Sequence, residues 1–512
     1  MQMKLFIKNI SKKIFIYLIS FLTGSIILSS CKKDFLNDPK PTDQVSTKDV
    51  FASADGVRAY FNGIYRNIRA QWQSLDGSAG GVDDTYSFEA LNLARVAKGT
   101  DIVMAFPTFF IYDYQYQNRE PTYRRTLFTW EFPYENINQF NILIKGVEES
   151  TALSEADKKL FTAEARALRA WFYFELIREF QLSINKDPNA PGVPIYTEPT
   201  SIENKGKPRG TIKETYDQIN SDIEYATQNI GDDRSLKAQV NSNVAWGMAA
   251  RIYLEQNRWA DAENAAQKAR EGLELDPAGY TSNYNDLTSP EVIWGFPQST
   301  DGGQSLYYGT QSSFFEQTGA GYDGFYMSEE FVNHFSATDV RNTFYEYDAP
   351  GTPDHYGTNK FGTDSKDLQV PLINGQTVPL KELDFNESQI MMRVGEMYLI
   401  EAEAKARQGK ADAGDVLYQL QFNRDPQAAK SGNTGDALIK EILLERRKEL
   451  YGEIGVEFLD AKRLQLPLDR TSSNHEAPNN FIIPANSNLF TLKIPQKEID
   501  SNDFISDSDQ NP

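Results

Sequence analysis

The chain has 512 residues, of which 40% are hydrophobic, so it is long and apolar enough to bury a sizeable core. Its formal net charge is −20, and it has no long basic run, so its surface repels nucleic acid phosphates and anionic lipids. Neither is therefore expected as the main partner, and the single cysteine, Cys31, excludes an intrachain disulfide.

The first 30 residues have the layout of a secretory signal peptide, in which lysines precede an apolar stretch from Ile14 to Leu28. The sequence LSSC, which ends at Cys31, resembles the lipobox of bacterial lipoproteins, whose cysteine is lipidated and becomes the mature N-terminus. We therefore expect residues 1–30 to be a lipoprotein signal peptide, 31–47 a lipidated tether and 48–512 a single domain. An uncleaved membrane helix is the alternative, for which the apolar run is a little short at about 1.5 Å per residue.

Hydrophobic periodicity predicts a series of helices. The clearest is 155–180, where apolar residues recur at three- and four-residue spacing after Ser154, a suitable N-cap. In 246–277, small and aromatic residues occupy the positions typical of a tetratricopeptide helix hairpin, and 398–420 repeats the pattern more loosely. The predicted fold is mainly α: tetratricopeptide-like helical hairpins with long, irregular, loop-rich ligand-binding insertions. Further helices are expected at about 211–229, 240–256, 259–273, 388–408, 411–423 and 434–450.

Two loop-rich blocks, 72–130 and about 280–386, carry little helical period but many aromatic residues, glycines and amides. Loops of this length are usually functional or disordered, and their aromatic content argues against disorder. Exposed aromatic rings beside polar side chains suit a ligand that has both apolar faces and polar edges. The candidate ligand-binding residues are Trp72, Asp83, Asp84, Tyr86, Trp294, Tyr307, Tyr308, Tyr322, Tyr326 and Arg393. For each of these residues, packing within the loops is the alternative role.

Common catalytic and cofactor-binding patterns are missing from the sequence. The three histidines, His334, His355 and His475, lie far apart and form no HExxH pattern, which argues against a zinc site or a histidine-activated thiol. The sequence GAGYDG at 319–324 matches GxGxxG, but no strand–turn–helix pattern surrounds it, so dinucleotide binding is not expected there. We predict that the protein is not an enzyme and has no cofactor.

Adjacent carboxylates occur at Asp83 and Asp84, in the sequence GGVDDTY. Glycoside hydrolysis needs two carboxyl groups facing each other about 5–10 Å apart, which neighbours in sequence rarely provide. A turn, which the preceding glycines favour, or hydrogen bonding to a hydroxyl-rich ligand is the better interpretation. We predict no metal site, although Asp301 and Asp323 are available as oxygen ligands and leave the question of a calcium ion open.

Several separated segments, from the lipid cysteine to the C-terminus, have an order and spacing that are specific in combination. They are SCKKDFLNDPK, AEARALRAWFYFELIREF, KPRGTIKETYDQINSDIEYA, VAWGMAARIYLEQNRWADAENAAQKA, IMMRVGEMYLIEAEAKARQGK, ILLERRKELYGEIGVEFLDAKR and IPQKEIDSND. Together these segments resemble the SusD/RagB family of nutrient-binding outer-membrane lipoproteins. The sequence departs from the family in the longer connection QLSINKDPNAPGVPIY and at Glu457 and Ala461, which affects packing and charge pairing.

The resemblance implies a helical scaffold with a loop-rich binding face, lipid-anchored to the outer membrane and facing the exterior. It implies that the protein captures a glycan oligomer and hands it to a SusC-like TonB-dependent barrel. Three alternatives stay open: a peptide-capturing, RagB-like protein of the same architecture, a surface glycoside hydrolase that uses Asp83 and Asp84, and a helical-repeat scaffold that binds only proteins.

Overall fold

The computed structural model describes residues 47–104, 107–201, 203, 205–281, 284–297, 309–316, 318–349, 352–383 and 387–512. The expected signal peptide and most of the tether, with Cys31, lie outside these residues, as do the candidates Tyr307 and Tyr308 and the acidic residue Asp301. Within the described part of the chain, no helix has the length and apolar character needed to cross a membrane.

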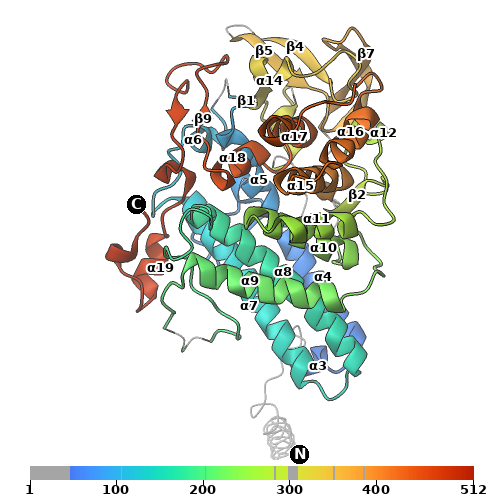
Figure 1. The fold of residues 1–512 in the computed structure, drawn as a ribbon. Coiled ribbons are helices and arrows are strands. Elements are labelled where there is room, and N and C mark those ends of the chain that lie inside the picture. The colour runs from blue at the N-terminus through green and yellow to red at the C-terminus, as the bar shows by residue number, and fades with distance from the viewer. Residues whose placement is uncertain are drawn as a thin grey trace, which may run out of the picture.

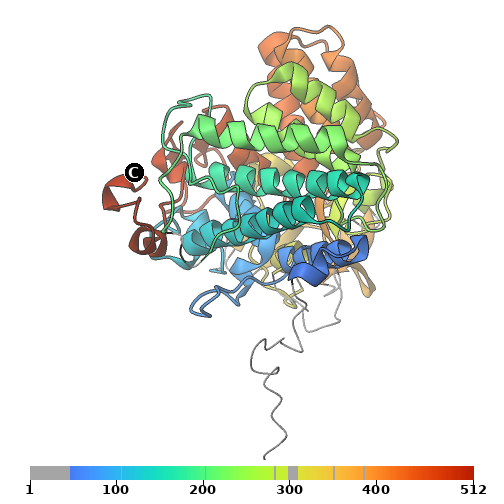
Figure 2. The same ribbon diagram turned by 90° about the horizontal axis from the view of Figure 1, so that it is seen from below.

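The scaffold consists of long helices that pack side by side as successive hairpins (Figures 1 and 2). Consecutive helices α7, α8 and α9 contact one another, α10 packs on α11, and α11 in turn contacts α15. This arrangement confirms the predicted mainly helical, tetratricopeptide-like fold. The helices are α4 (Ala54–Ile68), α7 (Arg124–Glu149), α8 (Glu155–Phe180), α9 (Ile212–Asn229), α10 (Ser242–Glu255), α11 (Trp259–Ala269), α15 (Val394–Arg407), α16 (Ala413–Arg424), α17 (Gly435–Leu450) and α18 (Val456–Arg463).

Small residues allow the helices of the α10–α11 hairpin to approach closely. Every alanine of α11 that faces the hairpin, from Ala262 to Ala269, is buried. Gly247 of α10 lies so near β8 that a Cβ atom there would sit 2.1 Å from the Met392 sulfur. These contacts confirm that the small-residue stripe in 246–277 serves packing.

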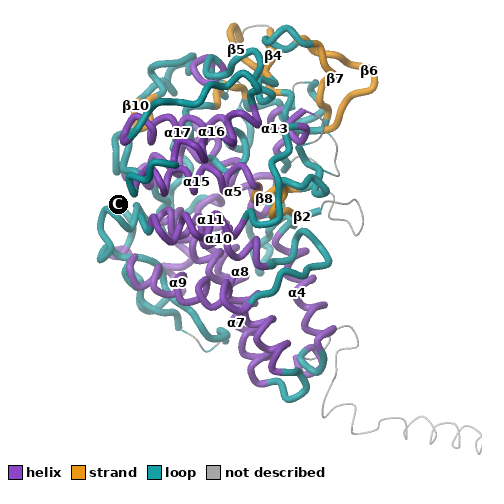
Figure 3. Tube along the Cα trace, turned by 45° about the vertical axis from the view of Figure 1, so that its right-hand side comes forward, coloured by secondary structure: helices purple, strands orange, loops and turns teal. Residues whose placement is uncertain are grey.

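Strands β4, β5, β6 and β7 lie at one end of the molecule, whereas β2 and β8 lie beside the middle of the helical scaffold (Figure 3). A four-stranded sheet has the order β1-β3-β5-β4, and its β1–β3 pair aligns Ile102 with Met327, which joins the two loop-rich blocks. The other pairs, β2–β8, β6–β7 and β9–β10, are antiparallel. The strands are β1 (Ile102–Val103), β2 (Val292–Phe296), β3 (Tyr326–Met327), β4 (Phe344–Ala349), β5 (Thr352–Thr358), β6 (Thr363–Pro371), β7 (Thr377–Glu382), β8 (Gln389–Arg393), β9 (Leu468–Asp469) and β10 (Ile482–Ile483).

The two loop-rich blocks hold more regular structure than the sequence predicted. Helix α5 (Ser87–Lys98) has every residue buried, so it lacks the amphipathic period that reveals a surface helix. The helix predicted to begin at residue 388 begins instead at Val394, because 389–393 form β8 against β2. Shorter elements are α3 (Thr47–Val50), α6 (Ile111–Tyr114), α12 (Ala278–Thr281), α13 (Gln311–Phe315), α14 (Glu329–Val332), α19 (Gln496–Ser501) and the 3₁₀ turns Asp83–Thr85, Asn488–Phe490 and Asp507–Asp509.

A buried carboxyl group on α5 makes stability depend on pH. Glu89 accepts a hydrogen bond from the Gln311 backbone N–H at 3.0 Å, and burial raises the pKa of Glu89 to about 7. Because this folded-state pKa lies above the unfolded value of 4.5, the folded protein binds more protons between these two pH values. The contribution of Glu89 to stability is therefore present at low pH and is lost as pH rises to about 7.

Replacing Glu89 by glutamine removes this ionisation and keeps a side-chain oxygen that accepts the Gln311 N–H. At pH 8 we expect Glu89→Gln to be more stable than the wild type by about 1–3 kcal/mol, with the difference shrinking toward pH 5. Urea unfolding of both proteins at the two pH values measures this effect. Glu155→Gln, at a side chain 90% exposed, is the matched control, and its stability should change by less than about 0.5 kcal/mol. Parallel pH profiles for wild type and Glu89→Gln would contradict the assignment.

Candidate ligand-binding site

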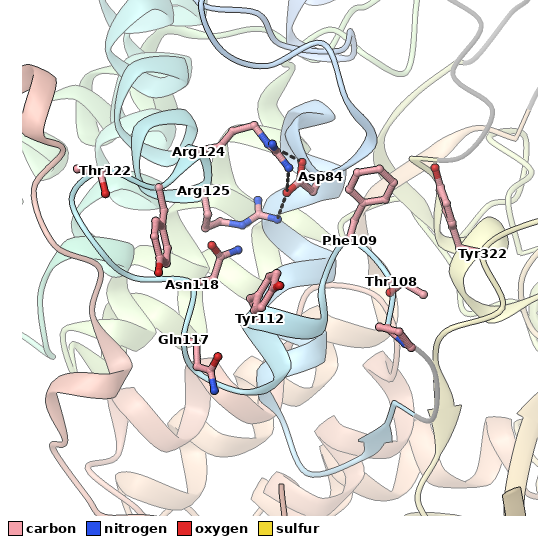
Figure 4. A pocket seen from close by; sticks show the side chains of 12 residues that line it. Asp84, Thr108, Phe109, Tyr112, Gln117, Asn118, Thr122, Arg124, Arg125 and Tyr322 are labelled. Carbon is pink, nitrogen blue, oxygen red and sulfur yellow. Dashed lines mark hydrogen bonds and ion pairs between the residues drawn. The ribbon is translucent and has the colours of Figure 1, made fainter. Parts of the chain in front are cut away.

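The two loop-rich blocks meet around a cavity of about 740 Å³ (Figure 4). The Phe110 ring contacts Phe314 edge to face, with ring centroids 4.8 Å apart. Gly324 allows the close approach, because a Cβ atom there would lie 2.5 Å from the Thr108 methyl carbon. The lining residues are Asp84, Pro107, Thr108, Phe109, Tyr112, Gln117, Asn118, Thr122, Tyr123, Arg124, Arg125 and Tyr322.

Four aromatic side chains in this lining are incompletely buried. Tyr112 is 57% exposed and Tyr123 is 44% exposed, while Phe109 and Tyr322 are intermediate. Phe109 and Tyr322 come from different blocks and pack edge to face, with ring centroids 5.2 Å apart. These rings offer apolar faces to a ligand while the scaffold holds them in place.

Polar groups of the cavity are organised around Asp84, at the 3₁₀ turn before α5. Arg124 donates from Nε and Nη2 to the two carboxylate oxygens of Asp84, each at 3.0 Å. Arg125 Nη2 lies 4.0 Å from the same carboxylate, and Arg125 Nε donates to Asp113 at 3.3 Å. Asn118 also donates to Asp113, at 3.0 Å. The first turn of α7 therefore directs two guanidinium groups toward the cavity (Figure 4).

Asp83 is not part of the cavity lining, but it holds one of the rings. The Tyr322 hydroxyl donates to Asp83 Oδ2. Burial raises the pKa of Asp83, the hydrogen bond from Tyr322 opposes that shift, and the neighbouring charge of Asp84 adds to it. Asp83 and Asp84 thus serve as orienting groups for a ring and a guanidinium, and their hydrogen bonds run to different partners.

Comparison with known proteins identifies the family of the chain that forms this cavity. A family model described as "Starch-binding associating with outer membrane" matches residues 34–254, and one described as "SusD family" matches residues 381–512. The chain belongs to the SusD/RagB family. The cavity-lining residues 84 and 107–125 fall within the first match, so most of the candidate site lies in sequence that the family model recognises.

SusD-like relatives occur in Formosa agariphila and Bacteroides ovatus. The SusD-like protein P38 of Formosa agariphila is 26% identical over 371 residues, which cover 63% of this chain and 69% of that protein. A SusD-like protein of Bacteroides ovatus is 29% identical over 168 residues, and the match spans only 31% of this chain and 29% of that relative.

Solved SusD structures share the fold of nearly the whole chain. A SusD-like carbohydrate binding protein from Bacteroides vulgatus has a TM-score of 0.74 at 23% identity and covers 89% of this chain and 98% of its own. A laminarin binding SusD-like protein has a TM-score of 0.64 at 20% identity, and the match covers 90% of this chain and 99% of that protein. At these sequence identities, the structural similarity is evidence for a shared fold alone.

Within this SusD-family fold, several rings expected to be exposed are buried. Tyr86, Trp294 and Tyr326 have no exposed surface, so the expectation that they are exposed is wrong. The Trp294 indole N–H donates to the Ala238 carbonyl at 2.8 Å, and its ring contacts Trp171 edge to face. Tyr86 and Trp294 belong to the main hydrophobic core, and Tyr326 is buried beside Tyr347 and His355, with ring centroids 5.4 and 5.2 Å away.

Trp72 lies away from the cavity that Figure 4 shows. It is 5% exposed, and its indole N–H donates to Glu135 at 3.0 Å. It lines a different cavity, of about 790 Å³, between α4 and α7. Burial raises the pKa of Glu135 to about 7. Among the described residues, Asp84 and Tyr322 are the sequence candidates that line the cavity of Figure 4, and Asp83 supports Tyr322.

Arg393, the remaining candidate in the described residues, is 4% exposed and belongs to an internal ion cluster. It binds Glu291 at 2.6 Å, Glu449 at 3.0 Å and Glu453 at 2.6 Å. The expectation that Arg393 contacts ligand is therefore corrected: its five N–H groups are directed to buried carboxylates, a hydroxyl and a carbonyl inside the protein. Glu449 lies on α17, so the cluster joins this helix to β8.

The aromatic residues Phe109, Tyr112 and Tyr123 were missed as individual candidates, together with Arg124. They lie within the first loop-rich block, in the stretch FFIYDYQYQNREPTYRR, where rings, amides and arginines alternate. That local mixture of residue types was the signal in the sequence that could have pointed to this stretch as part of the site. The spacing of the residues could not identify which aromatic rings of the stretch remain exposed.

Metal binding finds no support among the described residues, which contain no group of three or more histidine, cysteine, aspartate or glutamate side chains placed to hold an ion. Asp323 accepts hydrogen bonds from the hydroxyls of Tyr326 and Tyr347, at 3.0 and 3.2 Å. Burial raises the pKa of Asp323 to about 6, and the hydrogen bonds from the two tyrosines oppose that shift.

Proposed function

We propose that this SusD-family protein captures glycan oligomers in the cavity of Figure 4 and delivers them to a SusC-like TonB-dependent transporter. The observation that carries the proposal is the set of four partly exposed rings beside amide, carboxylate and guanidinium groups in one cavity. Sugar rings pack on aromatic faces, and their hydroxyls pair with such polar groups. The names of solved neighbours, which include carbohydrate-binding and laminarin-binding proteins, support a glycan as ligand.

The same proposal places the protein at the outer membrane through a lipid on Cys31, facing the exterior. The LSSC sequence supports the lipid anchor, and the family description "associating with outer membrane" supports the location. We propose binding without catalysis, because Asp84 is bound by arginines and Asp83 by Tyr322, so neither is free to face the other across a substrate.

Removing the exposed rings tests this function. We expect Tyr112→Ala and Tyr322→Ala each to weaken glycan binding about 5- to 100-fold, because each ring contributes about 1–3 kcal/mol of stacking and burial. Affinity electrophoresis and calorimetry against a glycan panel measure the loss, with an oligopeptide library in parallel for the peptide alternative. Phe422→Ala, at a 52% exposed ring on α16, is the matched control and should bind like the wild type.

Binding to peptides alone would replace the glycan proposal with the peptide-capturing alternative. Glycan binding that persists in both tyrosine variants would move the site elsewhere. Release of reducing sugar by the wild type, abolished in Asp84→Asn, would contradict a purely binding role.

A further inference from the structure

The arginines at the start of α7 give the cavity lining an excess of positive charge. Arg124 has a side chain that is 42% exposed, whereas the Arg125 side chain is 1% exposed. The one carboxylate in the lining is Asp84, whose side chain is 5% exposed. Two guanidinium groups therefore share a single carboxylate within the cavity wall.

Arg125 is incompletely satisfied by the protein. Its Nε donates to Asp113, but Nη1 and Nη2 are buried and have no hydrogen-bond partner among the described residues. The nearest carboxylate oxygen to Nη2, on Asp84, is 4.0 Å away and is already bound by Arg124. Buried donors without acceptors are unusual in folded proteins and cost free energy. An acceptor supplied by a ligand removes that cost.

Asp113 does not neutralise Arg125 fully. It is completely buried, its Oδ1 atom has no hydrogen-bond partner among the described residues, and burial raises its pKa despite the nearby Arg125. Its ionised form is therefore less favoured than that of an ordinary aspartate. Asp113 therefore satisfies the Arg125 Nε donor and leaves both Nη atoms of Arg125 without an acceptor among the described residues.

We propose that the cavity selects glycans that carry an anionic oxygen group, a carboxylate or a sulfate ester, bound by Arg124 and Arg125. This inference rests on the proposed glycan-binding function and names the substrate class of the same site. Asp84 occupies Arg124 Nε and one Nη2 donor, so the donors that Asp84 does not take are Arg124 Nη1 and the two Nη atoms of Arg125. Charge-assisted hydrogen bonds from these groups to an anionic oxygen are stronger than neutral ones.

The acidic character of the whole chain does not oppose this selection at short range. The net charge of −20 is spread over the surface, and salt at physiological strength screens exposed charges beyond about 8 Å. Charges in a partly enclosed cavity are screened less. The local guanidinium pair therefore determines the interaction with an anionic group that enters the cavity.

Matched charged and neutral glycans test the inference with the full protein. Polygalacturonate oligomers are compared with their carboxyl-reduced forms, and a sulfated galactan with its desulfated form, by calorimetry. We expect the wild type to bind at least one charged form about 10- to 100-fold more tightly than its neutral partner. A preference in one pair identifies whether carboxylate or sulfate is the preferred group.

Two arginine variants connect any preference to α7. Arg124→Gln and Arg125→Lys should each bring the ratio of charged-form to neutral-form affinity close to one. Arg124→Gln is the safer variant for folding, because its side chain is partly exposed, and thermal unfolding verifies both proteins. Lys213→Gln, at an exposed cation on α9 that pairs with Asp217, is the control and should keep the preference.

Three other results would contradict one or both proposals. Equal affinity for charged and neutral forms would overturn the anionic selection and leave the proposed glycan binding intact. Binding to no glycan, neutral or charged, would overturn both proposals. A charge preference that survives in both arginine variants would show that other residues bind the anionic group.

Discussion

Replacing Arg393 by methionine is expected to lower the free energy of unfolding by about 3–5 kcal/mol, because it breaks a buried ion cluster. Arg393 joins β8 to α17 and to Glu291, which precedes β2. Without it, Glu453 loses hydrogen bonds at 2.6 and 3.1 Å and keeps Lys360, while Glu291 keeps Arg424. The cluster then holds one uncompensated buried negative charge.

Urea unfolding at pH 7 measures this loss, and Lys213→Met is its control. Lys213 and Asp217 form a pair on α9 in which both side chains are more than half exposed, so this substitution should cost less than about 1 kcal/mol. Wild-type stability in Arg393→Met would contradict the structural role. Loss of glycan affinity in the fully folded variant would instead restore Arg393 as a ligand contact.

Trp294→Ala should be comparably damaging, with a loss of about 3–5 kcal/mol. The indole fills the core between β2 and α8, where it packs against Trp171 and Phe296 with ring centroids 5.8 and 5.2 Å away. Its removal creates a cavity and also leaves the Ala238 carbonyl without its indole donor. Both effects act on stability and neither acts on the candidate binding cavity.

Thermal and urea unfolding of Trp294→Ala test this expectation, with Phe422→Ala as a control at an exposed ring. Glycan affinity, corrected for the folded fraction, should equal that of the wild type. If Trp294→Ala is as stable as the wild type but binds glycan more weakly, Trp294 contacts the ligand, as the sequence alone predicted.

The regular helices could be predicted because their signals are local. Helix α8 spans Glu155–Phe180 as predicted, and the Ser154 hydroxyl accepts the Asp157 N–H at 3.1 Å as an N-cap. Helix α9 begins after Thr211, which forms a capping box with Glu214. In both helices, apolar spacing and capping residues act within a few positions of one another.

Helices with unusual environments were missed for physical reasons. Helix α5 is buried on every side, so polar residues such as Glu89 and Arg95 lie inside and hide its period. Helix α7 contains Pro133, and its aromatic residues lie on several of its faces, so its sequence shows no single apolar stripe. Their positions depend on contacts with distant segments, which a local pattern does not record.

The sequence by itself determined the family, the helical hairpins and the two blocks that meet at the candidate site. Only the tertiary structure decided which side chains in those blocks are exposed. Trp294 and Tyr326 are buried while Tyr112 and Tyr123 are partly exposed, although all four are aromatic residues of the two predicted loop-rich blocks. The reason is that burial depends on contacts between residues far apart in the chain, such as Trp171 with Trp294, whereas periodicity and capping depend on near neighbours.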